Sequence, residues 1–359
     1  MVELEARIDR ALRRVIDPDL GRSIVELGMV RGLAWNAEKQ VVSLTLQLTT
    51  PACPLKGHFE REIQGRLTEE LGEGWRAEVT FSAQTVGGGT VLLPNVKNLL
   101  LVGSGKGGVG KSTVAVNLAV ALAQQGARVG LLDADIYGPS VPILLGLEHA
   151  KPQVVQQEGR PLLVPLFKYG VHVMSLGFLV PPGQATPWRG PMASNTLRQL
   201  LVETQWPELD YLIVDMPPGT GDVQLTLAQQ FRPQGALIVT TPQQVAVADA
   251  EKALTMFQMP LVQVPVLGVV ENMSYFWTPE LPERRFYLFG RGGGVHLAEK
   301  YGVPFLGEIP LLEEIVLRSD QGVPPALSEG TPLSEAYHHL AGEVARTLSR
   351  LAYASAPSP

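Results

Sequence analysis

The sequence contains one cysteine, Cys53, and no long apolar run. A single cysteine excludes a disulfide within the chain and favours a reducing compartment. No stretch approaches the roughly 18 consecutive apolar residues that span a membrane. The N-terminal stretch "MVELEARIDRALRR" also lacks the apolar core of a secretory signal. These absences predict a cytoplasmic protein.

An excess of basic charge is also absent. The chain has 29 Lys and Arg against 35 Asp and Glu, a net charge of −6. Its overall charge therefore predicts neither a nucleic-acid nor an anionic-membrane partner. With 359 residues, 45% of them hydrophobic and 18% charged, the composition is that of a globular protein with a substantial core. This length suits two domains, or one large domain with an appendage.

The first 86 residues predict a small α+β domain. A helix over 6–15 should end before Asp17-Pro18, because a residue that precedes proline avoids the helical region. The alternation in "QVVSLTLQLT" indicates a half-buried strand, and "WRAEVTFSA" indicates a second. Between them, "PLKGHFEREIQGRLTEEL" has helical spacing. The glycines in 86–90 then predict a linker, which we place at 87–96.

From residue 97 the pattern changes to short runs that are apolar on both faces. Such runs are typical of buried parallel strands, and amphipathic stretches separate most of them. We therefore predict a doubly wound, mostly parallel α/β sheet over 97–352, followed by a flexible tail over 353–359. The runs are "NLLLVG", "RVGLLD", "VHVMSL", "YLIVD", "GALIVTT", "VLGVV" and "PFLGEIP".

A glycine-rich loop, "GKGGVGKST", lies between the first of these strands and a predicted helix. It fits the phosphate-loop pattern G-x-x-x-x-G-K-S/T, in which backbone N–H groups and the helix N-terminus attract phosphate oxygens. Lys111 would reach the β- and γ-phosphates, and the Ser112 hydroxyl would bind Mg²⁺. The residues expected to bind the nucleotide here are Gly105, Lys106, Gly107, Gly108, Val109, Gly110, Lys111, Ser112 and Thr113.

Three aspartates follow strands whose carboxyl ends should meet at the same edge. Asp215 ends "YLIVD" and suits a Mg²⁺-bound water. Asp133 and Asp135 lie in "LLDADIYGPS". One of these two aspartates could bind the metal or its water shell while the other orients an attacking water. Their spacing does not show which aspartate has which role, and a purely turn-forming role is the alternative for either. The stretch "PPGTGD" after Asp215 is either a switch loop that senses hydrolysis or a structural turn.

Taken in order, the motifs GKGGVGKS, "LLDADIYGPS", "WRGPM", "DMPPGTGD", "TTPQQVAVADA" and "ENMS" resemble the Mrp/ApbC family. Its members are P-loop ATPases described as iron–sulfur cluster carriers, and they are relatives of the MinD, ParA and nitrogenase iron-protein ATPases. The N-terminal "IDPDLGRSIVELGMV" and "LTTPACP" resemble the small PaaD/SufT-type domain that precedes many bacterial members. The resemblance implies a homodimeric, ATP-hydrolysing protein whose partners are iron–sulfur assembly proteins or apoprotein clients.

The resemblance also implies roles for individual residues. Lys106, the early lysine of this deviant Walker A loop, would cross a homodimer interface and contact the partner subunit's nucleotide. A cation supplied in this way acts only when two subunits close together, so hydrolysis should be slow. Asn272 would read the adenine, and Asp135 would lie near the attacking water. Lys106, Lys111 and Asp135 are thus the expected catalytic residues, and Ser112, Asp133 and Asp215 the expected Mg²⁺ site.

The sequence departs from the family where carriers usually place a cysteine pair after "ENMS". By register those positions are Thr278 and Leu281, and neither residue can supply a thiolate. "PERRFYLFGRGGG" continues the family pattern, which argues against a frame error. The usual 4Fe–4S cluster needs four thiolates from two subunits, so this chain cannot build it in that way. Cys53 is the only remaining soft ligand.

Cys53 lies between a predicted strand and a helix that begins near Lys56. Exposed N–H groups at that helix N-terminus should lower the thiol pKa and make the sulfur reactive and metal-binding. The alternative is a small buried residue at a strand–helix corner. One cysteine per chain offers a dimer two thiolates, so any iron–sulfur cluster held there should be labile and substoichiometric.

Two other function classes remain open. A MinD- or ParA-like positioning switch would bind membrane or DNA, but the last predicted helix carries only Arg346 and Arg350 beside two glutamates. A metabolic ATP-dependent enzyme would need a second catalytic constellation, which is not evident. The leading hypothesis is therefore an Mrp-type ATPase that assists iron–sulfur delivery.

Overall fold

The computed structural model describes residues 2–87, 90–136, 138–157, 159–180, 190–278, 280–281 and 283–355. The chain divides into two compact units, one of Met1–Val86 with Ala345–Pro359 and one of Gly87–Val344. The domain boundaries expected from the sequence remain a prediction, because packing within one structure does not test whether each part folds alone.

The first unit contains a three-stranded sheet with two helices. The strands are β1 (Val30–Asn36), β2 (Val41–Leu48) and β3 (Arg76–Ala83), and the helices are α1 (Val2–Arg13) and α2 (Lys56–Leu71). Strand β2 lies between β1, which is antiparallel to it, and β3, which is parallel to it. Every second side chain of β2 is buried, as the alternation predicted.

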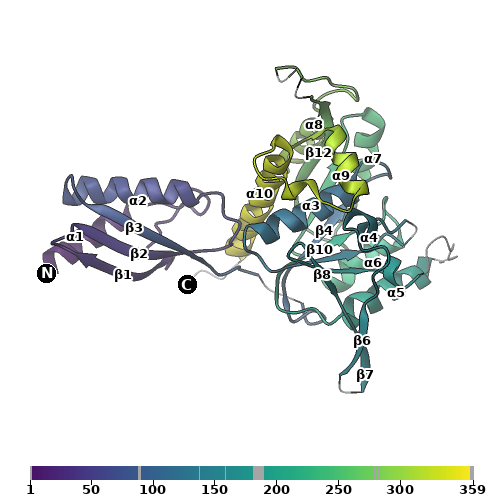
Figure 1. The fold of residues 1–359 in the computed structure, drawn as a ribbon, viewed down its shortest axis with the longest axis horizontal. Coiled ribbons are helices and arrows are strands. Elements are labelled where there is room, and N and C mark those ends of the chain that lie inside the picture. Colours follow the sequence, from purple (N-terminus) through teal and green to yellow (C-terminus); the bar gives the residue numbers. More distant parts are fainter. Residues whose placement is uncertain are drawn as a thin grey trace. The chain divides into compact units, whose positions relative to one another are not determined.

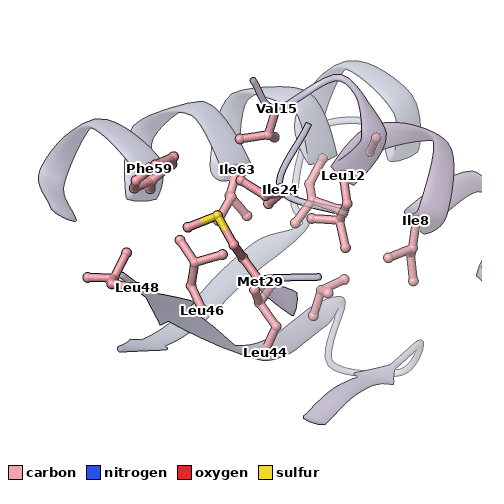
Figure 2. Packing of buried hydrophobic residues seen from close by; sticks show 13 residues of the cluster. Ile8, Leu12, Val15, Ile24, Met29, Leu44, Leu46, Leu48, Phe59 and Ile63 are labelled. Atoms are coloured by element: carbon pink, nitrogen blue, oxygen red, sulfur yellow. The ribbon is translucent and has the colours of Figure 1, made fainter. Parts of the chain in front are cut away.

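The core of this unit lies between the sheet and the helices (Figure 2). It is built from apolar side chains of β2, α1, α2 and the segment between α1 and β1: Ile8, Leu12, Val15, Ile24, Met29, Leu44, Leu46, Leu48, Phe59 and Ile63. Helix α1 starts before the expected residue 6 and ends at Arg13. The sequence did not predict β1, because "VRGLAWN" contains a glycine and its pairing register shifts between Arg31 and Ala34.

The second unit is built on an eight-stranded sheet (Figure 1), whose order is β13-β12-β11-β4-β10-β5-β9-β8. All neighbours are parallel except β8 and β9. Each of the seven apolar runs contributes a strand, which confirms the predicted α/β class. The strands are β4 (Val96–Gly103), β5 (Val129–Asp133), β8 (Leu166–Lys168), β9 (Val171–Ser175), β10 (Leu209–Asp215), β11 (Gly235–Thr240), β12 (Val266–Phe276) and β13 (Phe305–Leu311).

Helices connect most of these strands. They are α3 (Lys111–Gln124), α4 (Val141–Leu144), α5 (Gly190–Glu203), α6 (Asp222–Phe231), α7 (Gln244–Gln258), α8 (Gly293–Tyr301), α9 (Glu313–Asp320) and α10 (Pro332–Ser355), with 3₁₀ turns η1 (Leu176–Phe178) and η2 (Pro325–Leu327). Strands β6 (Gln153–Gln157) and β7 (Arg160–Val164) form a separate antiparallel hairpin. Helix α3 is buried at every position from 114 to 122, as expected of a helix that is apolar all round.

Helix α10 contributes to both units, because the division falls between Val344 and Ala345. The sequence predicted a flexible tail from residue 353, but α10 continues through Ser355. The rest of that tail, 356–359, lies outside the described residues. No helix in the part of the chain that the structure describes is long and apolar enough to cross a membrane.

The strand order places β4 between β10 and β11 near the middle of the sheet. The chain places β5, β8, β9 and β10 on one side of β4 and then β11, β12 and β13 on the other. At such a reversal the connections diverge and leave a crevice at the carboxyl ends of the strands, where ligands bind in α/β folds. The residues that follow β4, β5, β10 and β12 are therefore the candidates for a site.

Candidate nucleotide site

The glycine-rich loop joins the end of β4 to the start of α3, as the sequence predicted. Gly110 precedes the helix with a left-handed φ of 79°, and a Cβ there would lie 2.2 Å from Asn272 Nδ2. A Cβ at Gly105 would lie 1.9 Å from the carbonyl carbon of Asp249 on α7. These two positions therefore require glycine because neighbouring atoms approach the loop backbone closely.

Lys111 and Asp215 form a buried ion pair across this loop. The Lys111 Nζ lies 2.5 Å from Asp215 Oδ1, with the two side chains 6% and 0% exposed. Lys111 also donates to the Ser112 hydroxyl at 3.2 Å. Burying a charged group is costly unless it is paired, so each of these two residues offsets the cost of burying the other.

The other Asp215 oxygen, Oδ2, is buried and has no hydrogen-bond partner among the described residues. A buried carboxylate oxygen without a donor is suited to a cation, and the Ser112 hydroxyl interacts with the same carboxylate. Carboxylate and hydroxyl oxygens are the ligand types that Mg²⁺ prefers. The donor set therefore fits Mg²⁺, with Asp215 and Ser112 as the residues that would hold it.

Asp133 lies beside Asp215, because β5 and β10 pair in register at these two residues. Its side chain is fully buried and accepts from three donors: the Asp135 N–H at 3.1 Å, the Val141 N–H at 3.2 Å and the Ser175 hydroxyl at 3.1 Å. Burial and the neighbouring Asp215 carboxylate raise the pKa of Asp133. Burial also raises the pKa of Asp215, and Lys111 opposes that shift.

Asp133 thus organises the turn that carries Asp135. This turn-forming contact was one of the alternatives that spacing left open, and it does not exclude a part in the metal shell. The metal role of Asp133 and the water-orienting role of Asp135 stay predictions. Tyr137 and the first two residues of the "WRGPM" motif, Trp188 and Arg189, lie outside the described residues.

The "PPGTGD" segment is tied to the phosphate loop by its backbone. The Gly219 N–H donates to the Ser104 carbonyl at 2.9 Å. Gln224, buried on α6, donates to the carbonyls of Pro217 at 2.9 Å and Pro218 at 3.1 Å. A displacement of the phosphate loop would therefore reach this segment directly. The role of Gln224 was not predicted from the sequence. The one local indication is that a glutamine lies in the first turn of α6, a few residues after Pro217 and Pro218.

Asn272 lies on β12 and is 5% exposed. Its amide donates to the Val109 carbonyl of the phosphate loop at 2.9 Å. The structure therefore gives this residue a contact that holds the phosphate loop, which the sequence did not reveal. Adenine recognition by Asn272 stays a prediction.

Lys106 is half-buried on the loop, and its carbonyl accepts from the Ser104 hydroxyl at 3.0 Å. This bond fixes the backbone that carries the side chain. A single chain does not test contact with a partner's nucleotide, so the intersubunit role of Lys106 stays a prediction.

Thr278 and Leu281, which occupy the usual cysteine positions, take part in hydrogen bonds within a short turn. The Leu281 N–H donates to the Thr278 carbonyl at 3.1 Å, and the Thr278 hydroxyl donates to Glu280. Across the described ranges, no three His, Cys, Asp or Glu side chains are gathered in a way that could hold a metal ion.

Cys53 belongs to the first unit and is half-buried, two residues before the Leu55 cap of α2. Burial raises the pKa of its thiol; the Leu55 N–H opposes this shift, and the Asp17 and Asp19 carboxylates add to it. The prediction of a lowered pKa was therefore wrong. The helix N-terminus is present, but desolvation and two carboxylates outweigh it. A cavity beside Cys53 is lined by residues that include Asp17, Asp19 and Arg346.

Two family models match the chain. The one described as "NUBPL iron-transfer P-loop NTPase" matches residues 95–345, and the one described as "Iron-sulfur cluster assembly protein" matches residues 5–81. Together they cover the phosphate-loop unit and the small sheet-containing unit.

Individual relatives extend over nearly the whole chain. A protein of Synechocystis named "Iron-sulfur cluster carrier protein" is 50% identical over 89% of this chain and 90% of its own length. A protein of the same name from Deinococcus radiodurans is 48% identical over 95% of this chain and 96% of its own. Among solved structures, a nucleotide-binding protein of Archaeoglobus fulgidus in complex with ADP is 43% identical. It matches with a TM-score of 0.56 over 67% of this chain and 90% of its own.

Proposed function

The chain belongs to the family of NUBPL iron-transfer P-loop NTPases, and from this premise we propose that it uses ATP to carry iron–sulfur clusters to apoprotein clients. One observation carries the nucleotide part of the proposal. A phosphate loop between a buried strand and a buried helix presents Lys111 in a 2.5 Å ion pair with Asp215. The names of the relatives support the second part of the proposal, that the cargo is an iron–sulfur cluster.

ATP binding exchanges the partners of this ion pair. The phosphate oxygens replace Asp215 as the counter-charge of Lys111, and backbone N–H groups of the loop and the N-terminus of α3 add further donors. Asp215 and the Ser112 hydroxyl would then be free to hold Mg²⁺. When bound, Mg²⁺ neutralises the charge that develops on the transferring phosphoryl group. Each buried charge thus keeps a partner before and after binding.

Hydrolysis requires a water in line with the γ-phosphate. Asp135 is the residue that orients this water, and Asp133 fixes the Asp135 backbone through the 3.1 Å bond from its N–H. Lys106 of a second copy supplies positive charge to the phosphoryl group when a homodimer closes. Turnover is slow, because only the closed dimer is competent.

The cluster is cargo, and Cys53 is the residue of this chain that offers it a thiolate. A dimer supplies two such thiolates, so the remaining ligands come from the client or from a small thiol. The raised pKa of Cys53 keeps the thiol protonated, and a metal must displace that proton. Cluster binding is therefore weak and labile, which suits delivery better than storage.

The experiment is nucleotide binding by isothermal calorimetry with ATP and Mg²⁺. Lys111→Ala should abolish binding, because the loop loses the cation that meets the phosphates. Lys252→Ala is the matched control, since this lysine is 70% exposed and, among the described residues, forms its ion pair with Asp249 on its own helix. The control should bind as the unaltered protein does. Unaltered affinity in Lys111→Ala would refute the site.

A further inference from the structure

Glu271, the first residue of the "ENMS" motif, is a fully buried carboxylate to which the nucleotide chemistry gives no role. It lies on β12, directly before Asn272, and is 0% exposed. Its Oε1 accepts from the Ser274 hydroxyl at 2.7 Å, and its Oε2 accepts from the Gly294 N–H at 2.6 Å. Gly294 lies in the first turn of α8, where the helix dipole favours a negative charge. No lysine or arginine among the described residues forms an ion pair with Glu271.

The two donors lie on either side of one connection. Ser274 precedes, and Gly294 follows, the β12–α8 connection, which we define as residues 277–292; residues 279 and 282 of it lie outside the described ones. Phe276 and Phe286 also exchange backbone hydrogen bonds at 2.8 and 2.9 Å. The side chain of Glu271 therefore joins the two ends of this connection through hydrogen bonds.

The next two residues reach the phosphate loop. Asn272 donates to the Val109 carbonyl at 2.9 Å. Met273 has a left-handed φ of 54°, which is rare for a residue with a side chain, and its Cε lies 3.5 Å from where a Cβ on Gly110 would be. Glu271 thus bonds to both ends of the connection, while its neighbour Asn272 bonds to the phosphate loop.

Two tyrosines, Tyr275 near the end of β12 and Tyr287 in the connection, contact each other, and an arginine of the connection lies over each ring. The Arg285 guanidinium lies 4.3 Å from the centre of the Tyr275 ring, and that of Arg291 lies 4.7 Å from the centre of the Tyr287 ring. The two rings meet edge to face at 6.3 Å. Both arginines are exposed. Arginine and tyrosine are enriched among the residues that contribute most to protein interfaces, so this cluster has a composition that suits partner contact.

We propose that Glu271 is a positioning residue that transmits nucleotide binding from the phosphate loop to the β12–α8 connection. A phosphate that draws in the loop moves the Val109 carbonyl and, through Asn272, the strand. Glu271 passes this displacement to both ends of the connection at once. The proposal rests on nucleotide binding at the phosphate loop, which is measured separately below.

The test is hydrogen–deuterium exchange of the full chain with and without ATP and Mg²⁺. In the unaltered protein, nucleotide should slow exchange both in the phosphate loop and in 277–292. Glu271→Met removes both acceptors at similar length. We expect exchange in 277–292 to rise by roughly 10- to 100-fold, the range for lost hydrogen bonds to a charged acceptor. Its response to nucleotide should vanish while nucleotide affinity is kept.

Two further variants separate transmission from general packing. Glu271→Gln should restore most of the response, because its amide oxygen can accept from Gly294 while its NH₂ donates to Ser274. Glu251→Met is the matched control: Glu251 anchors the far end of α8 through Lys300 at 2.7 Å and Tyr301 at 2.5 Å. The control should leave the response of 277–292 intact.

The outcomes distinguish the proposals. Absence of calorimetric nucleotide binding in the unaltered protein would remove the proposed function. Binding that protects the phosphate loop but leaves 277–292 unchanged would overturn the role of Glu271. A normal response in Glu271→Met, or an equal loss in the Glu251 control, would also overturn it. If Glu271→Met does not fold, Ser274→Ala removes only one donor and should weaken the response; an unweakened response would refute the proposal.

Discussion

Removing Lys111 should destabilise the second unit even without nucleotide, because Asp215 then stays buried without its counter-charge. Both side chains are almost fully buried, and their charged atoms lie 2.5 Å apart. Breaking such a pair by removing one partner costs about 3–5 kcal/mol. For a unit of this size that corresponds to a lower melting temperature by roughly 6–20 °C.

The assay is chemical denaturation of Lys111→Ala at neutral pH in the absence of nucleotide. Lys97→Ala is the matched control, because its ion pair with Asp210 at 2.9 Å is partly exposed and Arg128 also pairs with that carboxylate. We expect the control to cost about 1 kcal/mol or less. The Lys111→Ala deficit should shrink as pH falls, since burial already raises the pKa of Asp215 and a protonated carboxyl needs no counter-charge.

A second substitution tests the cause of the loss. Asp215→Asn in the Lys111→Ala background removes the stranded charge and should recover at least about 2 kcal/mol. Unchanged stability of Lys111→Ala, or strictly additive losses in the double variant, would refute the reasoning.

Three further predictions concern single residues, two of them in the phosphate loop. Lys106→Ala should keep ATP affinity but lose turnover; a steady-state rate that is unchanged and independent of protein concentration would contradict the intersubunit role. Gly110→Ala should weaken ATP binding at least about tenfold, because a left-handed residue gains a Cβ that strikes Asn272; calorimetry measures this. Asp210→Asn should cost about 2 kcal/mol at pH 7 in a denaturation assay, since burial would raise the Asp210 pKa but hydrogen bonds from Arg128 lower it to about 2. That stabilisation is present above the ordinary aspartate pKa and is lost as pH falls toward 2, so an undiminished difference near pH 2 would contradict it.

The sequence predicted those features that are encoded within a few adjacent residues. Strand β10 was evident from the apolar run "YLIVD", and all seven of its residues are buried in the structure. The phosphate loop was evident from its glycines and Lys111. Strand β1 was not evident, because a glycine and a shifted register break its alternation.

Contacts between distant residues were not predictable in this way. The bond from Asn272 to Val109 joins positions 163 residues apart, and no local pattern encodes it. The pKa of Cys53 was predicted in the wrong direction for the same reason. The helix beside it is local in sequence, whereas the carboxylates of Asp17 and Asp19 come from a segment more than 30 residues earlier.

The central claim is that this chain handles iron–sulfur clusters although Thr278 and Leu281 replace the usual cysteines. Anaerobic reconstitution with iron and sulfide, followed by a visible spectrum and an iron count, tests it most directly. We predict weak, substoichiometric cluster binding in the unaltered protein that Cys53→Ser removes, with ATP affinity unchanged in both. A stable cluster that survives Cys53→Ser would contradict the assignment of Cys53, and no bound iron in the unaltered protein would contradict the carrier function itself.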